Sequence, residues 1–299
     1  MIPKYEDLMR PLLSSLNENG ILTLEQCTNK MSDVFQLSSA EREEMLNKGN
    51  QTVIKNRTGW AKFYLERAGL LSTISRGKYS ITKKGKSVLS DDSIKLDLHY
   101  LLTIPEFADF YKRNKQEKVE DKHGENAIAS SDRTPDEILE GQYNSLNQNL
   151  ADEILNKIMD MSPSFFENLV ITLLESMGYG HGKVTGRSGD GGIDGIIGED
   201  KLGLEVIHIQ AKRWNPGSNV GRKELQSFVG ALAGQSGRKG VFITTSNFTK
   251  EAIDYNPANV KIAKIDGNKL AHLMIEHNIG VSIKTTYEIK KLDLDFYVE

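Results

Sequence analysis

A charged segment without hydrophobic periodicity divides this chain into two parts. It runs over residues 112–137 as KRNKQEKVEDKHGENAIASSDRTPDE and contains no Phe, Trp or Tyr. Such a segment buries too little apolar surface to offset the conformational entropy lost on folding, which is typical of a linker. The chain has 299 residues and is longer than a typical single domain. We therefore predict two compact domains joined by this linker.

The part before the linker, residues 1–111, has the pattern of a mainly helical domain. Apolar residues recur at helical spacing over 5–19 and, less regularly, over 22–35. Ser38 and Glu41 form a capping-box pattern at the start of a third helix. Three short helices in this order are typical of the first half of a winged-helix domain.

The next segment, VIKNRTGWAKFYLERAGLL, predicts a longer helix that ends at Gly69. Two short strand-like runs then flank Arg76-Gly77 and predict a β-hairpin. In a winged helix, such a helix enters the major groove of DNA and the hairpin lies along the phosphate backbone. A winged helix can also dock other proteins, and that alternative stays open.

Positive charge is concentrated in this helix and hairpin, although the whole chain has a formal net charge of −3. Residues 48–86 contain ten Lys or Arg against one acid, Glu66, a local charge of +9. This is the electrostatic pattern of a phosphate-binding surface, with a solvated basic face as the alternative. The basic residues that we expect to contact DNA are Lys55, Arg57, Lys62, Arg67, Arg76 and Lys78.

The part after the linker begins with a long amphipathic helix over 135–161, of which 138–161 is expected to connect the two domains. A second domain is predicted over 162–299, where Ser162-Pro163 is a typical helix start. The pattern along it is helix, three strands, helix, strand, which predicts an α/β fold whose mixed sheet lies between two helices. A further strand, VKIAKI, and a helix capped by Asp266 extend it.

Three residues of this second domain form a pattern that suits phosphodiester hydrolysis. In the strand LGLEVIHIQAK, Gln210 and Lys212 share one face, while Ile207, Ile209 and Ala211 share the other and pack the core. Asp194 lies in the preceding strand, and antiparallel pairing would bring its carboxylate beside them. Asp194, the Gln210 amide oxygen and the Ala211 carbonyl would bind a hard cation, Mg²⁺ or alternatively Mn²⁺, and Lys212 would orient water or stabilise the transition state.

Other polar residues compete for, or add to, these roles. Glu167 could add a carboxylate from the preceding helix, although a lone Glu there can be merely solvated. Asp190 is a rival metal ligand in the glycine-rich run SGDGG. His208 is expected to pack inside the fold, and Cys27, the single cysteine, is expected to be structural. No phosphate-binding P-loop pattern occurs, which argues against a nucleotide-driven motor.

The chain resembles the Mrr-type restriction endonucleases, a branch of the PD-(D/E)xK nuclease superfamily. The resemblance lies in FENLVITLLESMGYG, GRSGDGGIDGII, IHIQAKRW, VGRKELQSFVGAL and KGVFITTSNFTKEA, and in the winged-helix runs PKYEDLMRPLL, QTVIKNRTGWAKFYLERAGLL and GKYSITKKGKSVL. It implies that Asp194, Gln210 and Lys212 are the catalytic positions, in the Q-x-K variant, with Glu167 as the early glutamate. It also implies that Arg222, Lys223 and Gln226 contact DNA.

The composition, that of an ordinary globular protein, favours a cytoplasmic location. The resemblance implies an enzyme of host defence that cleaves double-stranded DNA, in particular methylated DNA, as in type IV restriction. Cleavage of two strands predicts a homodimer or higher homo-oligomer. No signal peptide or membrane segment is expected, since no apolar run is long enough. Two alternatives stay open: a DNA-binding regulator with an inactive nuclease-like domain, and a repair or junction-resolving nuclease.

Overall fold

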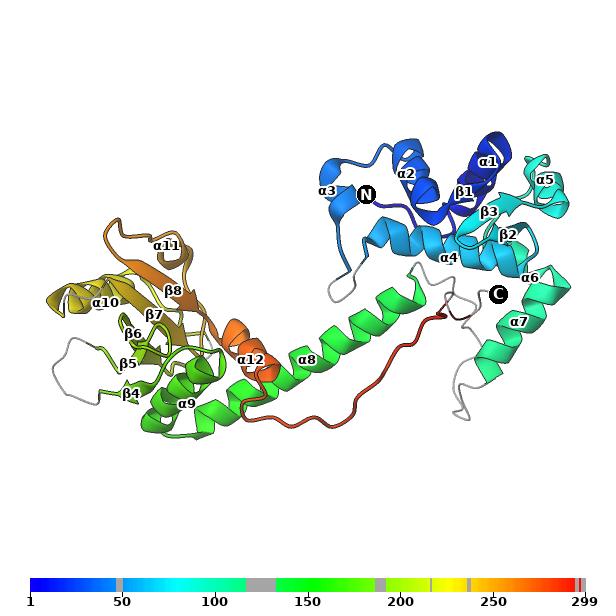
Figure 1. Cartoon of the computed structure of the whole chain (residues 1–299). Helices are drawn as coiled ribbons and strands as arrows, with labels where there is room; N and C mark the ends of the chain where they lie inside the picture. The colour runs from blue at the N-terminus through cyan, green and yellow to red at the C-terminus, as the bar shows by residue number, and fades with distance from the viewer. Residues whose placement is uncertain are drawn as a thin grey trace. The chain divides into compact units, whose positions relative to one another are not determined.

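The computed structural model describes residues 1–46, 51–116, 133–185, 192–215, 217–235, 238–293 and 296. The chain forms two compact units, which are coloured by residue number in Figure 1. Unit 1 comprises Met1–Gln142 with Lys291–Glu299, and unit 2 comprises Tyr143–Lys290. Most of the predicted linker, residues 117–132, lies outside the described residues. The chain on either side of that gap is helical, in α7 and α8.

Unit 1 is mainly helical and carries one small antiparallel sheet of order β1-β3-β2. Its elements are α1 (Met9–Asn19), β1 (Leu22–Thr23), α2 (Leu24–Val34), α3 (Ser39–Glu43), α4 (Val53–Arg67), β2 (Leu71–Ser75), β3 (Lys78–Ile81), α5 (Lys83–Leu89), α6 (Leu98–Leu102) and α7 (Pro105–Gln116). The helical N-terminal region and the hairpin at Arg76-Gly77 are thus confirmed, as is the capping box at Ser38.

Local sequence explains how these elements begin. The Thr52 hydroxyl accepts a hydrogen bond from the Lys55 N–H at the start of α4, and Thr23 and Gln26 form a reciprocal capping box at the start of α2. The strand β1 lies inside a range expected to be helical, because Leu22 and Thr23 pair with β3 before α2 begins. A strand of two residues is too short to show a period in the sequence.

Unit 2 contains a five-stranded sheet of order β4-β5-β6-β7-β8. Its elements are α8 (Pro135–Asp160, which begins in unit 1), α9 (Pro163–Ser176), β4 (Gly182–Val184), β5 (Gly195–Gly198), β6 (Val206–Lys212), α10 (Arg222–Gly234), β7 (Lys239–Thr244), α11 (Lys250–Ile253), β8 (Lys261–Ile265) and α12 (Gly267–Glu276). The predicted order of helix, three strands, helix, strand is confirmed. The pairs β4–β5 and β5–β6 are antiparallel, whereas β6–β7 and β7–β8 are parallel.

Helices cover both faces of this sheet, and each face has its own apolar core (Figure 1). On one face, Ile207 and Ile209 of β6 pack with residues of α8, α9 and α12, and Ala211 packs at the edge of that cluster. On the other face, Phe242 of β7 packs against Phe228 of α10. The predicted alternation along β6 is therefore confirmed, with the apolar face toward α9.

The antiparallel pair β5–β6 brings the beginning of one strand beside the end of the other. Gly195, the first residue of β5, is in register with Ile209, so Asp194 lies near the last residues of β6. Asp194 was expected within the strand and lies directly before it, although its N–H donates to the Ile209 carbonyl over 2.8 Å.

Among the described residues, no helix is both long and apolar enough to cross a membrane.

Candidate active site

The Asp194 carboxylate is held against the end of β6. Its Oδ2 accepts a hydrogen bond from the Ala211 N–H over 2.7 Å. The backbone carbonyl of Asp194 also accepts a hydrogen bond from the Thr185 N–H over 2.9 Å. These contacts hold the carboxylate at the N–H of Ala211, which lies between Gln210 and Lys212 in the sequence of β6.

Gln210 is buried, with 4% of its surface exposed. Its Oε1 atom has no hydrogen-bond partner among the described residues, which is costly for a buried amide oxygen and makes this oxygen suitable for binding a cation or a hydrogen-bond donor. Gly192 packs closely against this side chain: a Cβ atom at position 192 would lie 2.3 Å from Gln210 Nε2. Gly192 also has a φ of 97°, which favours glycine. The chain before Asp194 is thus shaped around Gln210.

Glu167 of α9 lies close enough to Asp194 and Lys212 for their charges to shift its pKa. Burial raises the pKa of its carboxyl, the negative charge of Asp194 raises that pKa further, and the positive charge of Lys212 lowers it. Charged residues from α9, from just before β5 and from the end of β6 therefore interact electrostatically. Glu167, Asp194 and Lys212 therefore lie close enough to influence one another, and Gln210 precedes Ala211, whose N–H holds the Asp194 carboxylate. Their catalytic roles remain a prediction.

This set of atoms fits a hard divalent cation. Asp194 and Glu167 provide carboxylate oxygens and Gln210 provides an unsatisfied amide oxygen, which are the donor types that Mg²⁺ prefers. No cluster of three or more His, Cys, Asp or Glu with metal-binding geometry occurs in the part of the chain that the structure describes. Asp190, the rival ligand, lies outside the described residues.

His208 lies on the same face of β6 as Gln210 and Lys212, and α10 begins at Arg222. His208 is 5% exposed, and burial lowers the pKa of its imidazole, so the neutral ring predicted to pack there is favoured. On α10, Arg222 lies 5.1 Å over the ring of Tyr255, while Lys223 and Gln226 are exposed. Their contact with DNA remains a prediction.

The basic residues predicted to bind DNA in unit 1 have different surroundings. Lys55 is exposed on α4, and Arg76 and Lys78 are exposed at the tip of the hairpin. Lys62 Nζ lies 3.3 Å from Glu66 Oε2 and 4.5 Å from the ring centre of Tyr79. Arg67 lies over the rings of Phe63 and Phe110. Lys55, Arg67, Arg76 and Lys78 are thus the exposed members of this set, and Arg67 also packs over two rings.

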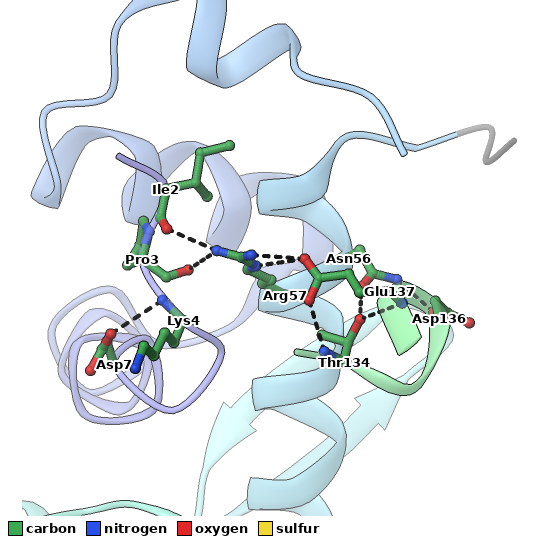
Figure 2. A network of polar contacts seen from close by, with 9 residues as sticks. All are labelled: Ile2, Pro3, Lys4, Asp7, Asn56, Arg57, Thr134, Asp136 and Glu137. Carbon is green, nitrogen blue, oxygen red and sulfur yellow. Dashed lines mark hydrogen bonds and ion pairs between the residues drawn. The ribbon is translucent and has the colours of Figure 1, made fainter. Parts of the chain in front are cut away.

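Arg57 is engaged inside unit 1, as Figure 2 shows. Its Nη1 atom donates to the carbonyls of Ile2 and Pro3 over 2.8 and 2.9 Å, and its Nε atom donates to Glu137 Oε1 over 2.9 Å. A direct contact of Arg57 with DNA would have to replace these bonds. The DNA role of Arg57 therefore remains a prediction without support from its surroundings.

The same network includes the buried residues Asn56 and Thr134. The Thr134 hydroxyl donates to Asn56 Oδ1 over 2.6 Å, and Asn56 Nδ2 donates to Asp136 Oδ2 over 2.6 Å (Figure 2). Trp60 Nε1 donates to the same Asp136 oxygen over 3.0 Å. The first turn of α8 is thus bound to α4. The spacing Thr134-x-x-Glu137 is a helix-start signal that could have placed the beginning of this helix.

Comparison with known proteins identifies the family of the chain. Residues 158–274 match the family model described as "Restriction endonuclease", and residues 5–91 match the model of the Mrr N-terminal domain. The chain is 36% identical over 309 aligned positions to the type IV methyl-directed restriction enzyme EcoKMrr of Escherichia coli K12, with 99% of each chain covered.

Two solved structures share more distant similarity. The DNA modification-dependent restriction endonuclease AspBHI is 22% identical with a TM-score of 0.37, covering 45% of this chain and 36% of its own. The MspJI restriction endonuclease, solved with a 27-mer oligonucleotide, is 20% identical with a TM-score of 0.33, covering 68% of this chain and 49% of its own. On the full-length similarity to EcoKMrr and the two matched models, the chain belongs to the Mrr family of restriction endonucleases.

Proposed function

We propose that this restriction endonuclease uses a divalent cation, Mg²⁺ or Mn²⁺, to hydrolyse phosphodiester bonds of methylated double-stranded DNA. The observation that carries the proposal is the convergence of Asp194, Gln210 and Lys212, with the Asp194 carboxylate bound to the Ala211 N–H and the Gln210 amide oxygen left without a partner. A buried oxygen that lacks a donor beside a carboxylate is suited to a cation.

Each residue has a distinct role in this proposal. Asp194 and Gln210 hold the cation, with the Ala211 carbonyl as a further ligand, and Glu167 supplies a second carboxylate directly or through water. When bound, the cation supplies Lewis-acid stabilisation of the charge that develops on the phosphate. Lys212 orients the attacking water and stabilises the negative charge of the transition state. Hydrolysis inverts at phosphorus if the water attacks in line with the leaving oxygen.

Unit 1 delivers the DNA in this proposal. Its exposed basic residues, Lys55 on α4 and Arg76 and Lys78 on the hairpin, suit phosphate contacts. Methylation dependence is supported by the similarity to EcoKMrr, which is named as methyl-directed. Cleavage of both strands requires two active sites, so the active species is a homodimer or higher homo-oligomer.

The experiment compares wild type with Lys212→Ala on methylated and unmethylated plasmids in Mg²⁺, Mn²⁺ or EDTA. We expect wild type to cleave the methylated plasmid in either metal and not in EDTA. Lys212→Ala is expected to lose at least about a hundredfold in rate, as removal of a group that stabilises transition-state charge does. Lys201→Ala, an exposed lysine of the same unit, serves as the matched control.

Three results would contradict separate parts of the proposal. Full cleavage by Lys212→Ala would contradict the catalytic role of Lys212. Cleavage in EDTA would contradict the requirement for a divalent cation. Equal cleavage of the two plasmids would remove the dependence on methylation and leave a general deoxyribonuclease.

A further inference from the structure

The end of β7 changes abruptly from apolar to hydroxyl-bearing residues without becoming exposed. Val241, Phe242 and Ile243 are followed by Thr244 and Thr245, and then by a serine, in the run VFITTS. Thr244 has no exposed surface and Thr245 is 6% exposed. Buried hydroxyl groups destabilise a fold unless they are hydrogen-bonded, so these two threonines need a structural reason.

The reason lies in the neighbouring strand. Lys212 and Thr244 form the last register pair of the parallel strands β6 and β7. The Thr244 hydroxyl donates to the Lys212 carbonyl over 2.8 Å, and the Thr245 N–H donates to the same carbonyl over 3.3 Å. The Thr244 oxygen also accepts a hydrogen bond from the Ser246 N–H over 3.1 Å. The hydroxyl of Thr244 is therefore held on both sides.

The chain that leaves the sheet after Lys212 is fixed by a second contact. The Thr245 hydroxyl donates to the Trp214 carbonyl over 2.7 Å. The Trp214 N–H turns back to donate to the Lys212 carbonyl over 3.1 Å. The two threonines thus bind the carbonyls on either side of Arg213. The backbone that carries the Lys212 side chain cannot rotate without breaking at least one of these bonds.

We propose that Thr244 and Thr245 are positioning residues for Lys212, which hold its backbone so that its side chain points to the reacting phosphate. The proposal rests on the proposed catalytic role of Lys212. A misplacement of about 1 Å of a catalytic group can cost about a hundredfold in rate, so small errors in this backbone matter. The two threonines do not touch substrate or cation. Their effect reaches the reaction only through Lys212.

The test replaces Thr244 by valine, which keeps the shape of the side chain and removes the hydroxyl. A typical net hydrogen bond corresponds to a three- to tenfold change, and we expect kcat on methylated DNA to fall by about this factor. KM for DNA and the half-saturating Mg²⁺ concentration should not change, because Asp194 and Gln210 are untouched. Thr244→Ser restores the hydroxyl and should restore kcat.

The matched control is Thr172→Val on α9, which removes an exposed hydroxyl that donates to the Asn168 carbonyl over 3.0 Å. It should leave kcat unchanged. All rates are measured well below the melting temperature of each variant, which circular dichroism gives. If Thr244→Val does not fold, Thr245→Val with Thr245→Ser as its rescue tests the second contact in the same way.

The outcomes separate this proposal from the proposed function. A wild-type kcat in both valine variants, or a low kcat that serine does not restore, would overturn the positioning role. A rise in KM or in the half-saturating Mg²⁺ concentration in step with the loss of kcat would also overturn it, since the whole site would then be disturbed. If Lys212→Ala cleaves DNA normally, it is the catalytic assignment that fails.

Discussion

At the residue scale, the most informative side chain is Gln210. Under the proposed function, a glutamine at a position where PD-(D/E)xK nucleases usually have a carboxylate lowers the negative charge that would face the cation. Its burial and its unpartnered oxygen nevertheless place a strong acceptor beside Asp194. The proposed site therefore has two carboxylates, those of Asp194 and Glu167, and we expect it to bind metal more weakly than a site with three.

A prediction at this scale concerns Cys27, which has no exposed surface. Burial raises the pKa of its thiol from 9 to about 11, so the folded state disfavours the thiolate. Because the folded pKa of this acid is raised, its contribution to stability is complete below pH 9 and is lost as pH rises from 9 to 11. Cys27→Ala should show a smaller loss of unfolding free energy over that interval.

Reaction with iodoacetamide at pH 8 gives an independent measurement. Native protein should react far more slowly than protein in guanidinium chloride. The thiolate is the reactive form, and the folded protein buries Cys27 as the neutral thiol. Comparable rates in the two conditions would show that Cys27 is accessible.

At the element scale, the contact between α4 and the first turn of α8 decides what Arg57 does. The side chains of Arg57 and Glu137 are only 18% and 10% exposed, and the same arginine also holds the carbonyls of Ile2 and Pro3. Removing one partner leaves the other charge largely desolvated. One guanidinium therefore links the N-terminal segment, α4 and the first turn of α8.

We predict that Arg57→Ala lowers the unfolding free energy of unit 1 by about 2 to 3 kcal/mol, because it breaks charged hydrogen bonds and leaves Glu137 unpaired. Urea denaturation followed by tryptophan fluorescence measures this, since Trp60 belongs to the same network. Arg42→Ala, which removes an exposed ion pair with Asp33, should cost at most about 1 kcal/mol. Equal effects of the two substitutions would contradict the structural role of Arg57.

At the scale of the whole molecule, the net charge of −3 conceals an uneven distribution. The basic residues gather between 48 and 86 in unit 1, whereas unit 2 provides the carboxylates of the site. Under the proposed function, binding and hydrolysis of DNA depend on different parts of one chain. Substitutions in unit 1 should change DNA affinity without changing the chemistry at Lys212.

Lys55 tests this division, because it is exposed on α4 and is better suited to the purpose than Arg57. In the Lys212→Ala background, Lys55→Ala should weaken DNA binding and reduce the slope of log K against log salt by about 0.9, the value for one phosphate contact. Fluorescence anisotropy over a range of NaCl concentrations measures both. Lys95→Ala, an exposed lysine outside the basic segment, should change neither. An unchanged slope for Lys55→Ala would favour a protein-docking role for the winged helix.

The sequence by itself determined the elements of unit 2 and the grouping of the residues predicted to be catalytic. Alternation along β6 separates Gln210 and Lys212 from Ile207 and Ile209, and this follows from backbone geometry that every strand shares. The short turn between β5 and β6 then places Asp194 beside them. Such properties are local, so they can be read without knowledge of the packing.

Only the tertiary structure decided the roles of Arg57, Thr244 and Thr245. Glu137 lies 80 positions after Arg57 in the sequence, and the Thr244 hydroxyl meets a carbonyl 32 positions before it. In the sequence, Arg57 is one of several basic residues and the two threonines are ordinary strand residues. A long-range hydrogen bond depends on which elements pack together and in which register. Composition and periodicity do not contain that information, so the partners emerge only when the chain is folded.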